Sequence, residues 1–226
     1  MPTRTAATAR TLQAVLFDMD GTLVDTEGLW RHAVENEAEL LGLVLGEQDQ
    51  PHILGRPVEY TAGYLHRGSG TSRTLASVAG SLDHRFTSLV ASQVVPLPGA
   101  LELLDAVRAA GMKTALVSAS PRSVVDIVLD ALDRRRFSVS FAAGETERTK
   151  PDPDPYLAAV AALGLDPAEC VAVEDTPVGV ASAEAAGCAV VAVPSATPIP
   201  AGPGRVVVRS LLDVDLPLLQ SLVTGR

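Results

Sequence analysis

The chain has 226 residues, of which 47% are hydrophobic and 20% charged, and 27 Asp and Glu against 18 Lys and Arg give it a net charge of −9. This apolar content is sufficient for a hydrophobic core, so it excludes disorder for most of the chain, and the length suits one domain or one domain with a smaller insertion. Binding to nucleic acid would require a basic face. The one basic run, Arg134–Arg136, is expected instead at an exposed helix end, where cations meet the negative end of the helix dipole.

Residues 1–11 contain Arg, Thr and Ala without the apolar stretch of a secretion signal, and we expect them to form a disordered leader. No uncharged apolar run reaches the roughly 18 residues that a membrane-spanning helix needs. Cys170 and Cys188 form neither a CxxC pair nor a disulfide framework, and both fall in strand-like runs, which favours buried free thiols. We therefore expect a cytoplasmic protein without a membrane or nucleic-acid partner. Because no apolar patch demands a second copy, we also expect a monomer.

Short runs of apolar and β-branched residues predict strands along most of the chain. The runs are continuous rather than alternating, which is typical of parallel strands buried on both faces. In chain order, the expected strands are residues 14–18, 114–118, 139–142, 170–174, 189–193 and, as a candidate sixth, 205–208.

Helical patterns separate these strands, and several begin at a proline and end at a glycine. Such helices are expected at residues 98–111, 153–164 and 177–187, and a C-terminal helix at 211–223 is expected to pack on the core. Strand followed by helix, repeated along the chain, predicts an α/β fold, a Rossmann-like doubly wound parallel sheet.

Residues 26–95 interrupt this alternation, because they contain helical patterns and no strand run. Leu29, Trp30, Ala33 and Val34 follow the helical period, and residues 73–90 read as another helix. We therefore expect a small α-helical cap domain at 26–95, inserted into a Rossmann-like catalytic core made of residues 12–25 and 96–226.

Polar side chains cluster where the predicted strands end. In an open α/β sheet, ligands bind at the carboxyl ends of the strands. One by one, these residues are more simply read as turn residues, helix caps or a solvated lysine. Together, four carboxylates facing one lysine leave an excess of negative charge that a divalent cation would balance, and oxygen ligands without Cys or His favour Mg²⁺. The residues concerned are Asp18, Asp20, Ser118, Ser120, Lys150, Glu174 and Asp175.

This set suits phosphoryl transfer. Asp18 is the candidate nucleophile, and Asp20, placed by the turn at Gly21, would protonate the leaving oxygen and then activate water. Ser118 and the backbone N–H near Ala119 would bind the phosphoryl oxygens. Lys150 would neutralise the developing charge and hold Asp18 in place.

At these residues the chain resembles the haloacid dehalogenase superfamily. Residues 18–22, Asp-Met-Asp-Gly-Thr, resemble its first motif, and the other three motifs match Ser118, Lys150 with the following Pro-Asp-Pro, and residues 173–187. All four occur in order across about residues 12–210. The resemblance implies a Rossmann-like core with a helical cap, and Mg²⁺ bound by Asp18, the Asp20 carbonyl and Asp175 with support from Glu174. It is strongest to the branch of β-phosphoglucomutase and sugar-phosphate phosphatases.

Three features of the sequence distinguish between the activities found in this family. Asp20 argues against dehalogenation, since members named for that reaction lack this second Asp. The absence of lysine between Asp25 and Pro96 argues against a phosphonate hydrolase, which would need a cap lysine for a Schiff base. At the positions of the mutase cap histidine and arginine this chain has Trp30 and Val58, which favours hydrolysis over phosphosugar transfer.

The sequence thus predicts a Mg²⁺-dependent phosphatase acting on a small phosphorylated metabolite, a sugar or sugar-alcohol phosphate, through an aspartyl-phosphate on Asp18. A β-phosphoglucomutase-type mutase and a non-catalytic binding protein on the same fold stay open as alternatives. Trp30 and Arg56 are candidate substrate-binding residues of the cap. Trp30 reads equally well as cap core, and Arg56 as an exposed loop residue.

Overall fold

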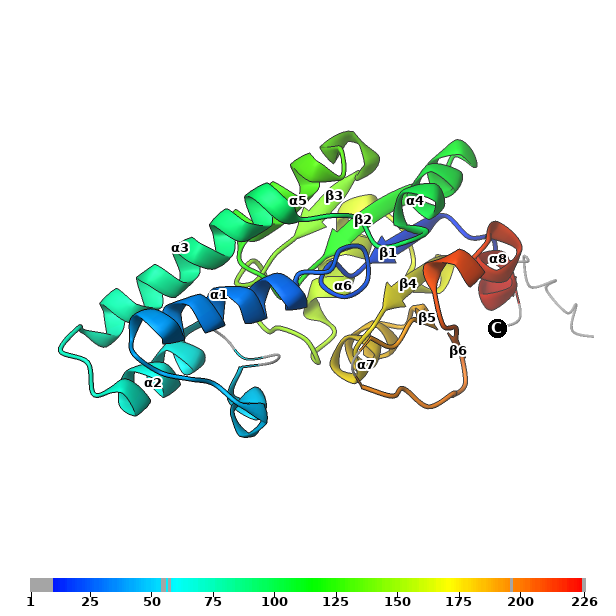
Figure 1. Cartoon of the computed structure of the whole chain (residues 1–226). Coiled ribbons are helices and arrows are strands. Elements are labelled where there is room, and N and C mark those ends of the chain that lie inside the picture. The colour runs from blue at the N-terminus through cyan, green and yellow to red at the C-terminus, as the bar shows by residue number, and fades with distance from the viewer. Residues whose placement is uncertain (1–9, 54–55, 57, 196, 225–226) are drawn as a thin grey trace, which may run out of the picture.

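The computed structural model describes residues 10–53, 56, 58–195 and 197–224. Most of the predicted leader, residues 1–9, lies outside this range. The described residues form a six-stranded, all-parallel sheet in the order β3-β2-β1-β4-β5-β6, which is the doubly wound arrangement (Figure 1). The strands are β1 (Ala14–Phe17), β2 (Lys113–Val117), β3 (Val139–Phe141), β4 (Cys170–Glu174), β5 (Ala189–Ala192) and β6 (Arg205–Val207).

The helices are divided between the sheet and an insertion after β1. They are α1 (Glu27–Leu40), α2 (Val58–Ser69), α3 (Leu75–Gln93), α4 (Ala100–Ala109), α5 (Arg122–Ala131), α6 (Asp154–Leu163), α7 (Pro177–Ala185) and α8 (Leu216–Thr224). The first three form the helical cap, which extends away from the sheet at the left of Figure 1.

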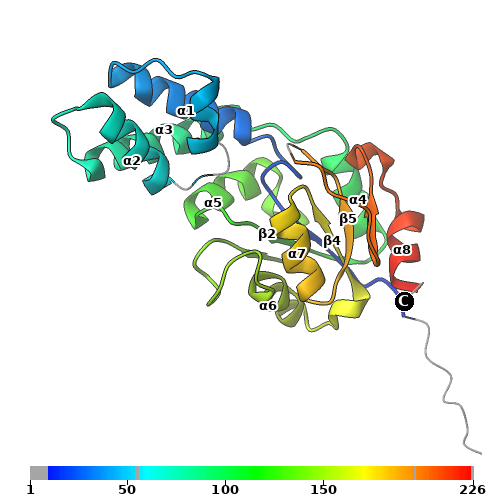
Figure 2. The same ribbon diagram turned by 90° about the horizontal axis from the view of Figure 1, so that it is seen from below.

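The central strands are buried on both faces, which explains their continuous apolar sequences. In β1, Val15 and Phe17 join the core formed with α4, α5 and α8, whereas Ala14 and Leu16 join the core formed with α6 and α7. Figure 2 shows α6 and α7 together on their side of the sheet. Cys170 and Cys188 are both buried and unbridged, as expected from the sequence.

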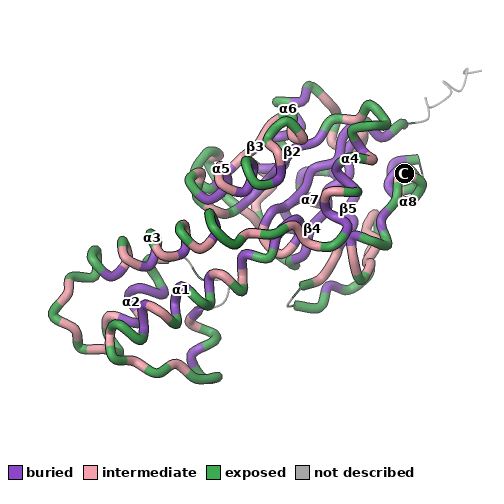
Figure 3. Tube along the Cα trace, turned by 45° about the horizontal axis from the view of Figure 1, so that its top comes forward, coloured by how far each residue is buried: buried purple, intermediate pink, exposed green. Residues whose placement is uncertain are grey.

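The cap is a three-helix unit with its own apolar contacts. Helices α1 and α2 both pack on α3, and α3 also reaches α5 of the core. Buried and exposed residues alternate along α1 and α3, whereas the strands of the sheet are mostly buried (Figure 3). The buried carboxylate of Glu37 on α1 accepts hydrogen bonds from Arg73, Ser81 and Arg85. These hydrogen bonds connect α1 to α3 and to the residues just before it.

The two chain segments that connect the cap to the core run side by side. Val24 and Pro96 form an antiparallel bridge, and the backbone N–H of Leu97 donates to the carbonyl of Leu23 at 2.8 Å. The cap therefore leaves and re-enters the core at one place, directly after the Asp18–Thr22 turn.

All six strands form where the sequence predicts them, including the candidate sixth. The C-terminal helix differs from its prediction: residues 211–213 form a 3-10 turn, and α8 begins only at Leu216. Pro217 suits the first turn of a helix, and the Asp215 carboxylate accepts from the N–H of Leu218, so the helix starts there. Helix α8 packs against β4 and β5, as predicted for this segment.

The basic run Arg134–Arg136 forms a 3-10 turn just beyond the end of α5. Its guanidinium groups pair with nearby carboxylates, those of Asp126, Asp130, Asp133 and Asp105. Because these acids neutralise it, the run does not present an unbalanced basic surface. Within the part of the chain that the structure describes, no helix is long and apolar enough to cross a membrane.

Candidate active site

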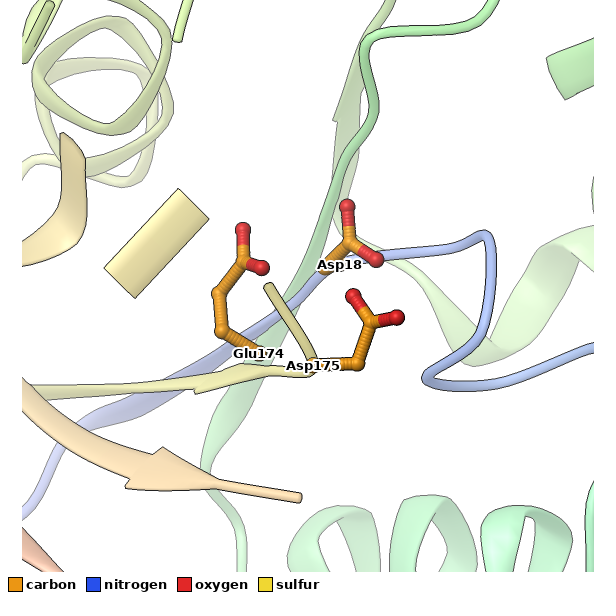
Figure 4. A group of neighbouring side chains, drawn as sticks. All are labelled: Asp18, Glu174 and Asp175. Carbon is orange, nitrogen blue, oxygen red and sulfur yellow. The ribbon is translucent and has the colours of Figure 1, made fainter. Parts of the chain in front are cut away.

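The predicted site residues meet at the carboxyl edge of the sheet. Asp18 follows β1, Ser118 follows β2, and Glu174 ends β4 with Asp175 next to it. Lys150 comes from the loop before α6. Figure 4 shows Asp18 and Asp175 with their carboxylates turned toward each other and Glu174 beside them. Parallel pairing of β1 with both β2 and β4 is what brings these three strand ends together.

Lys150 is the one cation in direct contact with the acids among the described residues. Its Nζ donates to Asp18 Oδ1 and to Glu174 Oε1, each at 2.6 Å, and to the carbonyl of Val117 at 2.9 Å. Burial acts to lower the pKa of Lys150, but the charges of Asp18 and Glu174 and their hydrogen bonds raise it above the ordinary lysine value. The ammonium is therefore charged and has all three of its protons engaged.

The acids retain more negative charge than Lys150 balances. Asp18 Oδ2 and Asp175 Oδ1 are buried and have no hydrogen-bond partner. Burial raises the pKa of Asp18 well above its usual range despite the opposing charge of Lys150. Burial also raises the pKa of Asp175 to about 7, although the hydrogen bond from Ser195 lowers it. Two unpartnered carboxylate oxygens in a buried acidic site are costly unless a cation or a proton compensates them.

A divalent metal ion fits this donor set. One carboxylate oxygen each from Asp18, Glu174 and Asp175 lie within 4.8 Å of one another, and all three residues are buried. The set consists of hard oxygen donors, and the orphaned oxygens belong to two of its members. The predicted metal residues Asp18, Glu174 and Asp175 are thus together, whereas the side chain of Asp20 is not part of this group.

Two glycines make the close approach of the acids possible. Gly21 has φ +82°, and a Cβ there would lie 2.2 Å from Asp175 Oδ2. A Cβ on Gly179, in the first turn of α7, would lie 2.0 Å from the carboxylate atoms of Glu174. Thr176 caps α7 through the Gly179 N–H, so the helix start is held against Glu174.

The Asp20 carboxylate is turned toward hydroxyl groups rather than toward the acidic cluster. Its Oδ2 accepts from Ser118 Oγ at 3.0 Å and from Ser120 Oγ at 2.8 Å. Its Oδ1 accepts from Thr26 Oγ1 at 2.5 Å, and Thr26 lies where the chain enters the cap. Asp20 is therefore held beside the loop after β2, which also contains exposed Ala119. The Asp20 side chain is therefore separate from the carboxylates that could hold a metal ion.

The two predicted cap residues have different surroundings. Trp30 is 8% exposed, stacks edge-on against Phe86 with ring centroids 5.2 Å apart, and donates its indole N–H to the Ile53 carbonyl. It is thus part of the cap core. Arg56 is exposed, with its Nε bound to the carbonyl of Pro51, and its guanidinium lies 5.0 Å from the centre of the Tyr60 ring.

Several residues in contact with the site were not identified from the sequence as site residues. The Thr26 hydroxyl donates to the carboxylate of Asp20, and the Ser195 hydroxyl donates to the carboxylate of Asp175. Tyr156 falls in the helix predicted at residues 153–164, and its hydroxyl donates to Glu174. A signal was present for Tyr156, since a tyrosine on a buried helix face needs a hydrogen-bond partner. For the two small hydroxyl residues the sequence contained no such signal.

Comparisons with known proteins agree with this geometry. A family model described as haloacid dehalogenase-like hydrolase matches residues 12–187. Protein CbbY of Rhodobacter capsulatus is 37% identical over 195 residues, covering 81% of this chain and 86% of that protein. Hexitol phosphatase B of Escherichia coli K12 is 32% identical over 194 residues, covering 84% and 86%.

A solved structure gives the same result for the fold. CbbY from Rhodobacter sphaeroides, in complex with phosphate, superposes with a TM-score of 0.78 at 26% identity and covers 92% of this chain and 99% of its own. These matches confirm the predicted α/β fold. They also confirm the prediction of a haloacid dehalogenase-like phosphoric monoester hydrolase. The chain belongs to the haloacid dehalogenase-like hydrolase family.

Proposed function

We propose that this protein is a Mg²⁺-dependent phosphatase that hydrolyses a small phosphorylated metabolite, a sugar or sugar-alcohol phosphate, through an aspartyl-phosphate on Asp18. One observation carries the proposal. Lys150 holds one oxygen of Asp18, the other oxygen is buried and unpartnered, and Asp18 forms with Glu174 and Asp175 a group of carboxylates close enough to share a metal ion. A carboxylate fixed in this way is oriented for attack on phosphorus next to a cation site.

The metal would be held by Asp18 and Asp175, with the backbone carbonyl of Asp20 as a further ligand and Glu174 in support. When bound, Mg²⁺ supplies positive charge for the phosphate oxygens and for the acids around it. The oxygen-only donor set and its excess of negative charge support Mg²⁺ rather than zinc.

The chain's own residues would then act in two half-reactions. Asp18 attacks phosphorus, the bond from phosphorus to the ester oxygen breaks, and Asp20 gives its proton to that oxygen. The Ser118 hydroxyl and the Ala119 N–H bind the phosphoryl oxygens, and Lys150 balances the added charge. In the second half-reaction Asp20 takes a proton from water, the water oxygen attacks phosphorus, and phosphate leaves while Asp18 is restored.

The cap supplies the proposed selectivity. Residues 26–95 would cover the catalytic edge, close over the substrate to exclude bulk water, and open to readmit it. Arg56 would contact a substrate hydroxyl or phosphate, and Trp30 would support the substrate entrance from the cap core. The name of the hexitol phosphatase relative supports a sugar-alcohol or sugar phosphate as substrate. We further propose that the protein is cytoplasmic and acts as a monomer on this small substrate, with no nucleic-acid partner.

The test is release of inorganic phosphate from a panel of sugar and sugar-alcohol phosphates, with Mg²⁺ or with a chelator. The panel includes glucose 6-phosphate and β-glucose 1-phosphate. Mg²⁺-dependent release that is lost in Asp18→Asn supports the proposal, and Asp20→Ala should slow both half-reactions. Interconversion of the two glucose phosphates after priming with a bisphosphate, without release, would indicate the mutase instead. Binding of these compounds without any turnover would indicate a non-catalytic protein.

A further inference from the structure

Tyr156 lies on α6, outside the residues to which the sequence or the family gives a role, and it is the largest fully buried side chain of the described chain. Its ring packs in the core between the sheet and helices α6 and α7. A phenylalanine would fill almost the same space. The hydroxyl therefore adds a buried polar group to an apolar core, which is costly unless that group has a specific partner.

That partner is Glu174. The Tyr156 hydroxyl donates to Glu174 Oε1 at 2.7 Å, and both residues are fully buried. The same oxygen accepts from Lys150 Nζ at 2.6 Å. The other oxygen, Oε2, has a long contact of 3.4 Å with the Thr176 hydroxyl. Tyr156 and Lys150 thus fix one oxygen of Glu174 and determine which way its carboxylate turns.

Tyr156 also contacts Lys150 directly. The Lys150 ammonium lies 5.2 Å from the centre of the Tyr156 ring, within the range of a cation–π interaction. Lys150 is therefore held by Tyr156 twice, through the ring and through the shared Glu174 oxygen. The ammonium also donates to Asp18 Oδ1 and to the carbonyl of Val117.

We propose that Tyr156 is a positioning residue, whose hydroxyl and ring hold Glu174 and Lys150 so that the ammonium stays on Asp18. Tyr156 itself touches neither the substrate nor the reacting atoms. This inference rests on the proposed function for its effect on turnover, but its effect on Lys150 is independent of any reaction. Loss of the hydroxyl removes one of two strong donors to Glu174 Oε1, and Lys150 and Glu174 then gain freedom to move.

The experiment compares Tyr156→Phe with Tyr64→Phe. Tyr64 also donates its hydroxyl to a carboxylate, that of Asp49, but does so within the cap. The control therefore loses the same kind of hydrogen bond without affecting Lys150.

The first readout is acylation of lysine, measured by mass spectrometry. The chain has two lysines, so Lys113 is an internal reference for Lys150. In the wild type, Lys150 should react far more slowly than Lys113. Tyr156→Phe should raise the ratio of the Lys150 rate to the Lys113 rate by about 10-fold or more, since Glu174 loses a donor that fixes the oxygen bound to Lys150, while the ring contact stays. Tyr64→Phe should leave the ratio unchanged. An unchanged ratio in Tyr156→Phe would overturn the proposal, whether or not the protein proves to be a phosphatase.

The second readout is turnover, arranged as a double-mutant cycle with Glu174→Gln. Tyr156→Phe should lower kcat by about 10-fold while KM changes by less than about 2-fold, because Tyr156 does not contact substrate. In the Glu174→Gln background the same substitution should have a much smaller effect, since Tyr156 acts through Glu174. If Tyr156→Phe lowered kcat by the same factor in the Glu174→Gln background as in the wild type, Tyr156 would not act through Glu174. If the wild type shows no phosphate release, the proposed function fails, and the acylation ratio alone decides the role of Tyr156.

Discussion

Gly179→Ala would place a methyl group where the Glu174 carboxylate now lies. The new Cβ would be 2.0 Å from both oxygens and the carboxyl carbon of Glu174. A free side chain would swing aside at little cost, but this carboxylate is fully buried and bound to Lys150 and Tyr156. Either α7 must retreat from β4 or Glu174 must leave its two donors.

The magnitude follows from these competing effects. Replacing glycine within a helix by alanine gains about 0.5–1 kcal/mol. Overpacking costs about 1–3 kcal/mol, and each displaced hydrogen bond to a charged group costs about 1.5–3 kcal/mol. The net result should be a loss of about 2–4 kcal/mol in the free energy of unfolding. For a chain of this length the Tm should fall by roughly 5–15 °C.

Gly80→Ala is the matched control. Gly80 is exposed on α3, and nothing lies within 4 Å of a Cβ built there. This variant keeps only the gain in helix propensity, about 0.5–1 kcal/mol, so its Tm should rise slightly. Scanning calorimetry with a chelator present measures both variants without a contribution from metal binding. If Gly179→Ala were as stable as Gly80→Ala, the close approach of α7 to Glu174 would be wrong.

Two further predictions concern charge. Burial raises the pKa of Asp175 to about 7, so between about pH 4 and pH 7 the metal-free native state holds a proton that the unfolded state has lost. The free energy of unfolding should therefore fall as the pH rises from about 4 to about 7, and Mg²⁺ should raise the Tm more at pH 8 than at pH 5. Equal increases in Tm at the two pH values would contradict this. Glu37→Gln should cost about 1–3 kcal/mol in urea unfolding, because Arg73 and Arg85 lose a buried acceptor but can turn to water. Exposed Glu39→Gln should cost almost nothing.

The sheet could be predicted from local sequence because its strands are short, buried on both faces and bounded by turn residues. The runs at β1 and β4 contain little besides Val, Ala, Leu and Phe, with Cys at the start of β4, so no other element suits them. The acids of the site were predictable for a related reason, since they directly follow those strands. The start of α8 was not, because the turn at Leu211–Asp213 reads as a continuation of the apolar helical pattern.

The surroundings of the acids depend on contacts between distant segments. Thr26 reaches Asp20 because the cap linker folds back over the turn after β1, and Ser195 reaches Asp175 because β5 lies next to β4. Neither residue has a local pattern that distinguishes it from an ordinary helix cap or loop hydroxyl. For Trp30 the sequence left two interpretations open, a substrate-binding residue of the cap and cap core, and its burial against Phe86 supports cap core.

The bridge between Val24 and Pro96 has a consequence for how proteins of this architecture can vary. The outgoing and returning segments are hydrogen-bonded neighbours. The whole insertion is therefore attached to the sheet in the same way as one short surface loop. Any segment whose two ends meet at this spacing could replace it without moving β1 or the acids beyond it, since domain insertion is tolerated best where the ends lie close together. The cap, which we propose selects the substrate, and the core, which we propose performs the chemistry, could therefore diverge separately.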